Sequence, residues 1–252
     1  MTKTEISVIL TTYNHLPYLR LFLGSFLKYS MPETELLIHV DGSTDGTVGW
    51  LKEQGLDYVY EEHHGMYHGY NEAASRASGE YLALGQEDMV VAPNWDRNLL
   101  KYAEKHRLLA IRFVEPGWGS FPPTMDFGKT FDTFDERGFM DYAESISQDK
   151  LIPWIGIGTS LFSRELFQEV GCYDENYDPY GIGDSDLWVT IKTRHPEVEF
   201  LRCESSIIYH FQSKSRLHFG EEEAKRINER TAAYFREKWG IPLSEMKERL
   251  GI

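Results

Sequence analysis

The stretch ISVILTTYNHLPYLRLFLGSFL, residues 6–27, decides the fold because it joins a buried strand to an amphipathic helix. Its first part, Ile6–Leu10, is a nearly continuous apolar run of the kind found in strands buried on both faces of a parallel sheet. Its second part repeats apolar residues at helical spacing from Leu16 to Leu27, and Pro17 stands where a first helical turn tolerates proline. The rest of the chain is expected to repeat this strand-and-helix unit.

The same alternation continues through the N-terminal half. Strands are predicted at residues 36–40, 58–60 and 81–84, with a short helix from Val48 and another at residues 71–78. Strict alternation of strands and helices indicates a parallel sheet with right-handed crossovers. We therefore expect an α/β fold with a Rossmann-like, mostly parallel sheet flanked by helices in a single domain.

The C-terminal half is less regular. Residues 115–150 combine Gly, Pro and Phe without a clear period, which is typical of a long loop. The segment Trp118–Phe139 is interpreted either as a lid over an acceptor or as a packed excursion without a role in binding. Gly156–Gly158 is expected to let the backbone approach an acceptor. Further elements are predicted as a helix at 187–193, strands at 198–201 and 207–209, and a last helix at 221–239.

Composition and charge exclude several classes of function. The 252 residues carry a formal net charge of −14, which disfavours nucleic-acid binding because that requires a basic face. Cys172 and Cys203 are too few for a disulfide framework or a zinc cluster. The start of the chain has no secretory pattern, and no apolar stretch approaches the ~20 residues of a spanning helix. The chain is therefore expected to be cytoplasmic, with a peripheral position at the inner face of the membrane as the alternative.

Polar residues follow three of the predicted strands. Residues 11–14 follow the first strand, Asp41 follows the second, and Glu87 and Asp88 follow the fourth. Ligands of such sheets bind beyond the carboxyl ends of the strands, so these side chains should converge. Two adjacent carboxylates at this edge suit a hard divalent cation, which prefers oxygen ligands and bridges to phosphates.

A second acidic segment holds Asp184 and Asp186 directly after the glycine-rich turn YGIG, residues 180–183. A carboxylate placed to open a helix suits a general base. Both side chains are equally compatible with a role at a helix N-terminus, where negative charge is favourable.

Three histidines, His63, His64 and His68, also cluster in the sequence. Their spacing suggests a metal site, but no nearby acid completes an obvious coordination set. A solvated loop near the ligand is the preferred interpretation.

A series of short motifs occurs in order along the chain: SVILTTYN (7–14), VDGSTDGT (40–47), NEA (71–73), ASGEY (77–81), QED (86–88), YGIGDSDLW (180–188), His210 and KWG (238–240). Together these motifs resemble family 2 of the inverting glycosyltransferases, whose members have the GT-A fold. The resemblance extends from Ser7 to Gly240 and implies transfer of a sugar from a nucleotide donor.

The resemblance implies a nucleotide site formed by Thr11, Tyr13, Asp41 and Glu87. An aromatic ring can stack on a nucleobase, and a carboxylate can accept a hydrogen bond from a base N–H. Ordinary turn chemistry is the competing interpretation for Asp41, which precedes a glycine. Glu87 replaces the first aspartate of the family's Asp-x-Asp motif, and its longer side chain is expected to reach the ribose, or the metal through water.

The resemblance also implies a metal site and a catalytic base. Asp88 and His210 are the expected metal ligands, and this combination of carboxylate and imidazole favours Mn²⁺ over Mg²⁺. Asp184 is the expected base, with Asp186 sharing that role or lying in the first helical turn. The family often carries a glutamate where this chain has Gly183.

The implied enzyme is an inverting, metal-dependent glycosyltransferase acting in surface polysaccharide or glycan synthesis. Its expected donor is a nucleotide-diphosphate sugar, first of all a UDP-sugar, and its acceptor is a glycan, a lipid-linked sugar or a protein. Residues 1–113 are expected to bind the donor, residues 114–218 to carry the acceptor and catalytic side, and residues 219–252 to form a C-terminal helical segment. The alternatives are a non-catalytic sugar-nucleotide-binding module and a nucleotidyltransferase, although the latter would need a glycine-rich loop with a basic residue after the first strand.

Overall fold

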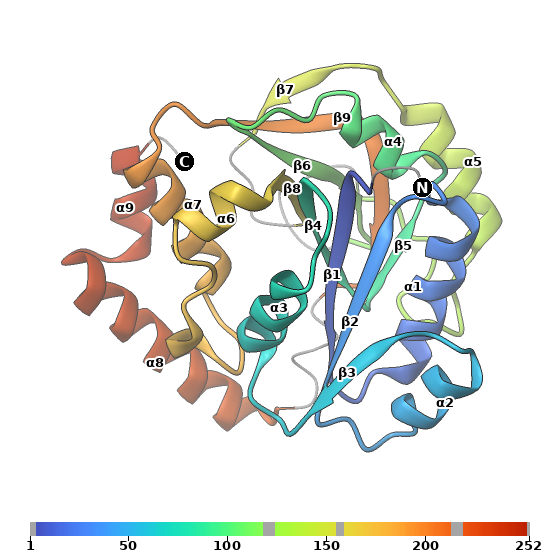
Figure 1. Cartoon of the computed structure of the whole chain (residues 1–252), viewed down its shortest axis with the longest axis horizontal. Coiled ribbons are helices and arrows are strands. Elements are labelled where there is room, and N and C mark those ends of the chain that lie inside the picture. Colours follow the sequence, from blue (N-terminus) through green and yellow to red (C-terminus); the bar gives the residue numbers. More distant parts are fainter. Residues whose placement is uncertain (1–3, 118–123, 155–158, 213–218, 251–252) are drawn as a thin grey trace.

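The computed structural model describes residues 4–117, 124–154, 159–212 and 219–250, and Figure 1 shows their arrangement. The expected approach of Gly156–Gly158 to an acceptor falls outside the described residues, as does the Trp118–Pro123 part of the expected lid. Within the described residues, none of the helices combines the length and the apolar character needed to cross a bilayer.

One sheet organises the molecule. Its strands lie in the order β3-β2-β1-β4-β8-β6-β9-β5, with β7 paired to β9. The strands are β1 (Ile6–Thr12), β2 (Glu35–Asp41), β3 (Tyr58–Glu61), β4 (Tyr81–Gln86), β5 (Met89–Val91), β6 (Arg107–Val114), β7 (Leu151–Pro153), β8 (Ser160–Ser163) and β9 (Glu199–His210).

Most of these strands are parallel, as expected from the sequence. β1 pairs in parallel with β2 and β4, β2 pairs with β3, and β6 pairs with β9. β8 is antiparallel to both β4 and β6, so these two strands run in the same direction. The carboxyl ends of β1, β2, β3, β4, β6 and β9 therefore lie at one edge of the sheet.

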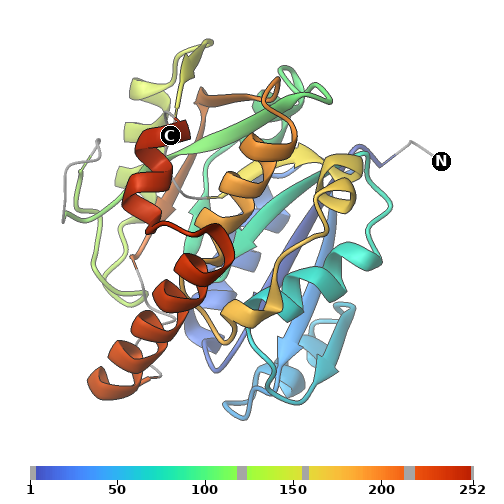
Figure 2. The same cartoon turned by 90° about the vertical axis from the view of Figure 1, so that its left-hand side faces the viewer.

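Helices cover both faces of the sheet (Figure 1). They are α1 (Leu16–Tyr29), α2 (Thr47–Glu53), α3 (Met66–Ser75), α4 (Trp95–Leu100), α5 (Glu136–Ile146), α6 (Arg164–Glu169), α7 (Gly183–Arg194), α8 (Glu221–Trp239) and α9 (Leu243–Leu250), with a 3₁₀ turn at Glu175–Tyr177. Tyr67 of α3, Trp188 of α7 and Phe235 of α8 belong to the buried cluster on one face. Phe22 of α1 and Leu99 of α4 belong to the cluster on the other face. Figure 2 shows α8 and α9, in red, lying over α7, in orange.

Some predicted elements differ from the observed ones. Helix α3 begins at Met66 instead of Asn71, because the Asp178 carboxylate accepts hydrogen bonds from the first N–H groups of the helix. Helix α5 lies inside the stretch that was expected to be irregular, and Asp135 caps it by accepting from the Gly138 N–H. The two predicted C-terminal strands are one strand, β9, with an irregular register opposite Ile111. The predicted helix at residues 221–239 is confirmed as α8.

Candidate active site

Three polar side chains meet where β4, β6 and β9 end. His210, the last residue of β9, places Nε2 3.5 Å from Oδ1 of Asp88. On its other side Nδ1 lies 2.7 Å from Oε1 of Glu115, which directly follows β6. Gln212 donates to the second oxygen of Glu115 over 2.7 Å. The structure thus brings together the two side chains expected to bind a metal, and it adds Glu115.

The electrostatics of this cluster favour positive charge. Burial by itself lowers the pKa of His210, but the charges of Asp88 and Glu115 and their hydrogen bonds outweigh it and raise the pKa to about 10. The imidazole therefore holds a proton between two carboxylates. Two carboxylates and an imidazole that together attract a proton in this way offer the negative charge and the ligand atoms that a divalent cation requires.

Glu87 points into a different environment from its neighbour Asp88. Its carboxylate is buried, and Oε1 lies 3.1 Å from Nδ1 of His15. Burial raises the pKa of Glu87, while the contact with His15 opposes that rise. The longer side chain that replaces the family's usual aspartate is therefore paired with His15, the residue directly before α1.

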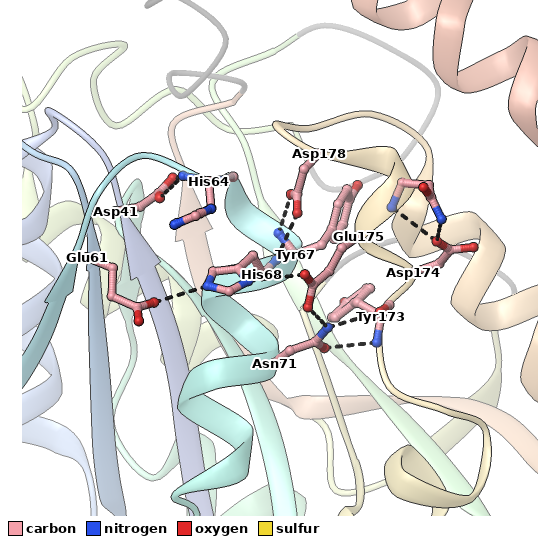
Figure 3. Close-up of polar contacts among 12 residues, drawn as sticks. Asp41, Glu61, His64, Tyr67, His68, Asn71, Tyr173, Asp174, Glu175 and Asp178 are labelled. Atoms are coloured by element: carbon pink, nitrogen blue, oxygen red, sulfur yellow. Dashed lines mark hydrogen bonds and ion pairs between the residues drawn. The ribbon is translucent and has the colours of Figure 1, made fainter.

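Asp41 and Tyr13 contact the same histidine. Figure 3 shows Asp41 beside His64, whose N–H donates to Oδ1 over 2.7 Å. Oδ2 of Asp41 accepts from Nδ1 of His63 at 2.8 Å and from the Gly65 N–H at 3.1 Å. The Tyr13 ring stacks on the His63 ring with a centroid distance of 4.1 Å and an interplanar angle of 19°. The structure thus brings Tyr13 and Asp41 together, and Asp41 also holds the loop that precedes α3.

Thr11 is buried, as are Asp41 and Glu87 of the residues expected to bind the nucleotide. Its Oγ1 has no hydrogen-bond partner among the described residues. This oxygen faces α3 at Gly69, where an added Cβ would collide with it. In this structure Thr11 is therefore packed against α3 instead of lining an accessible surface.

Asp184 lies in the first turn of α7 with one specific partner. The Tyr173 hydroxyl donates to Oδ1 over 2.9 Å. Burial raises the pKa of Asp184 to about 6, although the Tyr173 hydrogen bond opposes the shift. A carboxylate with this pKa is ionised at neutral pH and accepts a proton more readily than an ordinary aspartate, which suits a general base.

The glycine before Asp184 is explained by Tyr67. The Tyr67 hydroxyl donates to the Gly181 carbonyl and accepts from the Gly183 N–H, each over 3.0 Å. A Cβ at residue 183 would come within 2.5 Å of the Tyr67 ring. The difference from the family pattern at this position therefore follows from the packing of α3 against the α7 N-terminus.

Asp186 is built into the C-terminal helix contacts. Oδ1 accepts from the Tyr177 hydroxyl at 3.0 Å and from Trp239 Nε1 at 2.7 Å, while Oδ2 pairs with Lys238 Nζ at 2.7 Å. The residue is 3% exposed. These contacts tie α7 to the end of α8 and leave Asp186 less suited than Asp184 to accept a proton.

A group of tyrosines connects Asp184 to the strand edge. The Tyr173 and Tyr70 rings stack with their centroids 5.6 Å apart, and the Tyr70 hydroxyl donates to the Gly85 carbonyl of β4 over 2.9 Å. Burial raises the pKa of Tyr70 well above its usual value, and the charges of Asp184, Glu87 and Asp88 add to the rise. The charges of all three carboxylates therefore raise the pKa of the same buried phenol.

Sequence reasoning missed Glu115, Tyr173 and Asp178. Glu115 had a detectable signal, because it follows an apolar run that forms β6 and so belongs to the same set of strand ends as Asp88. Tyr173 and Asp178 had no detectable signal in the sequence. Each contacts a residue of another element, Asp184 of α7 for Tyr173 and Tyr67 of α3 for Asp178, and the sequence does not indicate that these residues meet.

The chain matches the models of two glycosyltransferase families. Residues 7–171 match the model of glycosyl transferase family 2, and residues 149–214 match a model described as the N-terminal domain of galactosyltransferase. A glucosyl-dolichyl phosphate glucuronosyltransferase from Haloferax volcanii is 26% identical over 185 residues, covering 68% of this chain and 56% of that protein. The chain thus spans little more than half the length of this relative.

Solved structures share the fold. GalNAc-T7, solved with UDP, GalNAc and Mn²⁺, superposes with a TM-score of 0.64 at 15% identity, covering 99% of this chain and 55% of that chain. The mannosyltransferase PcManGT from Pyrobaculum calidifontis, solved with GDP-Man and Mn²⁺, gives a TM-score of 0.59 at 19% identity, covering 83% of this chain and 57% of that chain. These likenesses confirm the expected GT-A fold. Because the family model matches more than half of the chain, the protein belongs to glycosyl transferase family 2.

Proposed function

We propose that this protein is an inverting glycosyltransferase that moves a sugar from a nucleotide-diphosphate sugar to an acceptor hydroxyl. The observation that carries the proposal is Asp184, a half-buried carboxylate with a pKa of about 6, linked through Tyr173 and Tyr70 to the strand that leads to Asp88. Residues 1–113 would bind the donor, and residues 114–218 would supply most of the acceptor and catalytic side.

Asp184 acts as the base in this proposal. Its carboxylate takes the proton from the acceptor hydroxyl while that oxygen forms a bond to the anomeric carbon. The bond from the anomeric carbon to the diphosphate breaks on the opposite face, so a single displacement inverts the configuration. Tyr173 orients Oδ1 and leaves the carboxylate further acceptor capacity for the hydroxyl.

Asp88 and His210 would hold a divalent cation, and Glu115 would orient His210 through Nδ1. The cation, when bound, neutralises charge on the departing diphosphate. The two carboxylates beside His210, which raise its pKa to about 10, support a site that attracts positive charge. Carboxylate plus imidazole ligation favours Mn²⁺ over Mg²⁺, and Mn²⁺ is present in both of the solved structures compared above.

Tyr13, Asp41 and Glu87 would serve the nucleoside and ribose. Tyr13 and Asp41 both contact His63, so a base entering between them would displace or stack on this imidazole. UDP in GalNAc-T7 supports a UDP-sugar as the first donor to test, and GDP-Man in PcManGT supplies the second. The lipid-linked sugar named for the Haloferax volcanii relative supports an acceptor of that class.

A panel of nucleotide sugars tests the proposal. The purified full chain is incubated with each UDP- and GDP-sugar, with and without Mn²⁺, and thermal shift identifies the donor. Product formation is then measured on glycan and polyprenyl-phosphate-sugar acceptors, and NMR of the product reports the anomeric configuration. Transfer with inversion that is lost in Asp184→Asn supports the proposal. Donor binding without transfer on any acceptor would instead indicate a binding module, and retained configuration would refute the single displacement.

A further inference from the structure

A second group of side chains with metal-ligand atoms comes from β2, β3 and α3. His39 on β2, Glu61 at the end of β3 and His68 on α3 each place one ligand atom within 4.8 Å of the other two. Figure 3 shows Glu61 and His68 pointing toward one another beneath the loop that contains His64. The sequence interpretation of this region as a solvated histidine loop missed this group, because His39 and Glu61 are brought to His68 by strand pairing.

We propose that His39, Glu61 and His68 form a binding site for a transition-metal ion of the Zn²⁺ class, separate from the cation site at Asp88 and His210. This site fastens helix α3 to strands β2 and β3. The proposal is independent of the glycosyl transfer proposed above.

The distances fit a tetrahedral ion. Nε2 of His39 and Nε2 of His68 lie 3.0 Å and 3.1 Å from the same oxygen, Oε2 of Glu61. Ligand atoms about 2.0–2.1 Å from a tetrahedral zinc ion are separated by about 3.3 Å, so a small outward movement of the three side chains accommodates the ion. Two imidazoles and one carboxylate form a three-ligand zinc set, with a fourth position left for water.

Residues behind the ligands have the arrangement typical of a metal site. Metal-bound histidines usually donate their second ring N–H to a carboxylate, which is itself held by hydrogen bonds. Nδ1 of His68 lies 3.1 Å from Oε2 of Glu175, and Nδ2 of Asn71 donates to Oε1 of Glu175 over 2.8 Å (Figure 3). Glu175 therefore fixes the orientation in which His68 directs Nε2 toward Glu61.

His39 supplies a second indication. Its side chain is 1% exposed, and its Nδ1 has no hydrogen-bond partner among the described residues. While Nε2 donates to Glu61, Nδ1 remains an unprotonated acceptor in a dry environment, which is costly. A metal on Nε2 would move the ring proton to Nδ1, where the buried Thr11 hydroxyl also lacks a partner and faces the same glycine, Gly69.

The ion can reach this site from solvent. The side chains of Glu61 and His68 are 37% and 21% exposed, whereas His39 forms the closed base of the site. Two imidazole ligands distinguish this site from the proposed site at Asp88 and His210, which offers one, and they favour zinc over manganese or magnesium. Bound metal would hold the start of α3 in place and thereby the loop whose N–H groups bind Asp41.

Calorimetry on the chelator-stripped full chain tests this site with Zn²⁺ alone, and Co²⁺ absorption reports tetrahedral coordination. We expect one Zn²⁺ per chain, bound at least tenfold more weakly by Glu61→Gln and by His68→Asn. Glu175→Gln should weaken binding by roughly 10–100-fold, because it removes an outer partner of a ligand and no ligand. Circular dichroism verifies that each variant is folded. If His68→Asn does not fold, Glu61→Gln at the half-exposed position decides the test.

Two controls separate this site from other zinc-binding groups. His106→Asn removes an exposed imidazole that pairs with Glu197 at 3.7 Å, and it should leave Zn²⁺ affinity unchanged. Asp88→Asn should also leave it unchanged, since Asp88 belongs to the other cluster. The proposal is overturned if the stripped wild-type chain binds no Zn²⁺, if Glu61→Gln and Glu175→Gln bind as tightly as wild type, or if Asp88→Asn alone removes the binding.

Discussion

Helix α7 carries two aspartates in its first turn, and the two sides of the helix place them in opposite surroundings. Asp184 is half-buried and receives a hydrogen bond from Tyr173, which lies between α6 and the 3₁₀ turn. Asp186 faces α8 and receives two neutral hydrogen bonds and one ion pair, the last from Lys238. Two identical side chains in one helical turn thus differ in whether their charge is already compensated.

The difference shows how one short acidic segment can serve both stability and chemistry. A carboxylate that pairs with a cation and accepts two further hydrogen bonds contributes to stability. It is not available for catalysis, because a substrate would have to displace one of these three partners. A half-buried carboxylate with a phenol as its partner keeps an elevated pKa and capacity to accept a proton. The sequence Asp184-Ser185-Asp186 carries no sign of this division, which comes from the elements packed on either side.

The largest expected effect separates the two aspartates by activity. Asp184→Asn keeps the shape of the side chain but cannot take a proton, so transfer should fall by roughly 10²–10⁴-fold while donor binding persists. Asp186→Asn is the matched control and should retain most of the transfer activity of the folded protein. Initial rates at saturating donor and acceptor, with donor affinity measured separately, provide the comparison. If the rate loss falls on Asp186→Asn instead, the roles assigned to the two residues are exchanged.

The second effect separates them by stability. Asp186→Asn removes the charge that pairs with Lys238 on α8, so the free energy of unfolding should fall by about 1–3 kcal/mol. The loss is limited because Lys238 also pairs with Asp174 at 2.7 Å. Urea unfolding followed by circular dichroism measures it, with Asp184→Asn as the reference that should not be destabilised. Equal destabilisation of both variants would contradict the division.

The site residues at the carboxyl ends of the strands could be predicted from the sequence, because most of them directly follow their own strand along the chain. Apolar runs identified the strands, and the polar residues that follow them, such as Asp41 and Asp88, must lie at the edge where parallel strands end. His210 at the end of β9 was found only through the family pattern, and it lies beside Asp88.

The remaining features depend on contacts between elements that are distant in the sequence. Asp178 fixes the start of α3 from more than a hundred residues away, and Tyr67 explains the glycine at position 183. Two of the three partners named for Asp186, Lys238 and Trp239, lie on α8, some fifty residues later. Periodicity and motif spacing carry no information about such pairs, because the pairs depend on how helices pack across the finished sheet.

The third effect is the pH dependence of stability at Asp184. Its folded pKa of about 6 lies above the ordinary value of 3.8, so between these values the folded state binds more protons than the unfolded state. Stability contributed by this group is therefore present at low pH and is lost as pH rises toward about 6. An asparagine does not ionise, so the Asp184→Asn protein does not lose this stability. Its free energy of unfolding above pH 6 should exceed that of wild type by on the order of 1–3 kcal/mol.

Comparison of the two proteins isolates this contribution. Asp178, whose burial also raises its pKa to about 6, titrates in both proteins and cancels in the difference. The gain of Asp184→Asn over wild type, measured by urea unfolding between pH 4 and pH 8, should grow with pH and then level off. A difference that does not change with pH would mean that Asp184 has no raised pKa.

The smallest effect tests the hydroxyl groups that face the two aspartates. The Tyr173 hydrogen bond lowers the pKa of Asp184 against the effect of burial, so Tyr173→Phe should raise that pKa further, by roughly one unit. The acid limb of the pH–rate profile should then move upward, and the ionised fraction of Asp184 at pH 6 should fall from about a half to about a tenth. Tyr177→Phe removes the corresponding hydroxyl from Asp186 and should leave the limb in place. A shift of the acid limb in Tyr173→Phe alone would identify Asp184 as the group that titrates during transfer. An equal shift of the limb in both variants would contradict this assignment, because the two hydroxyls contact different carboxylates.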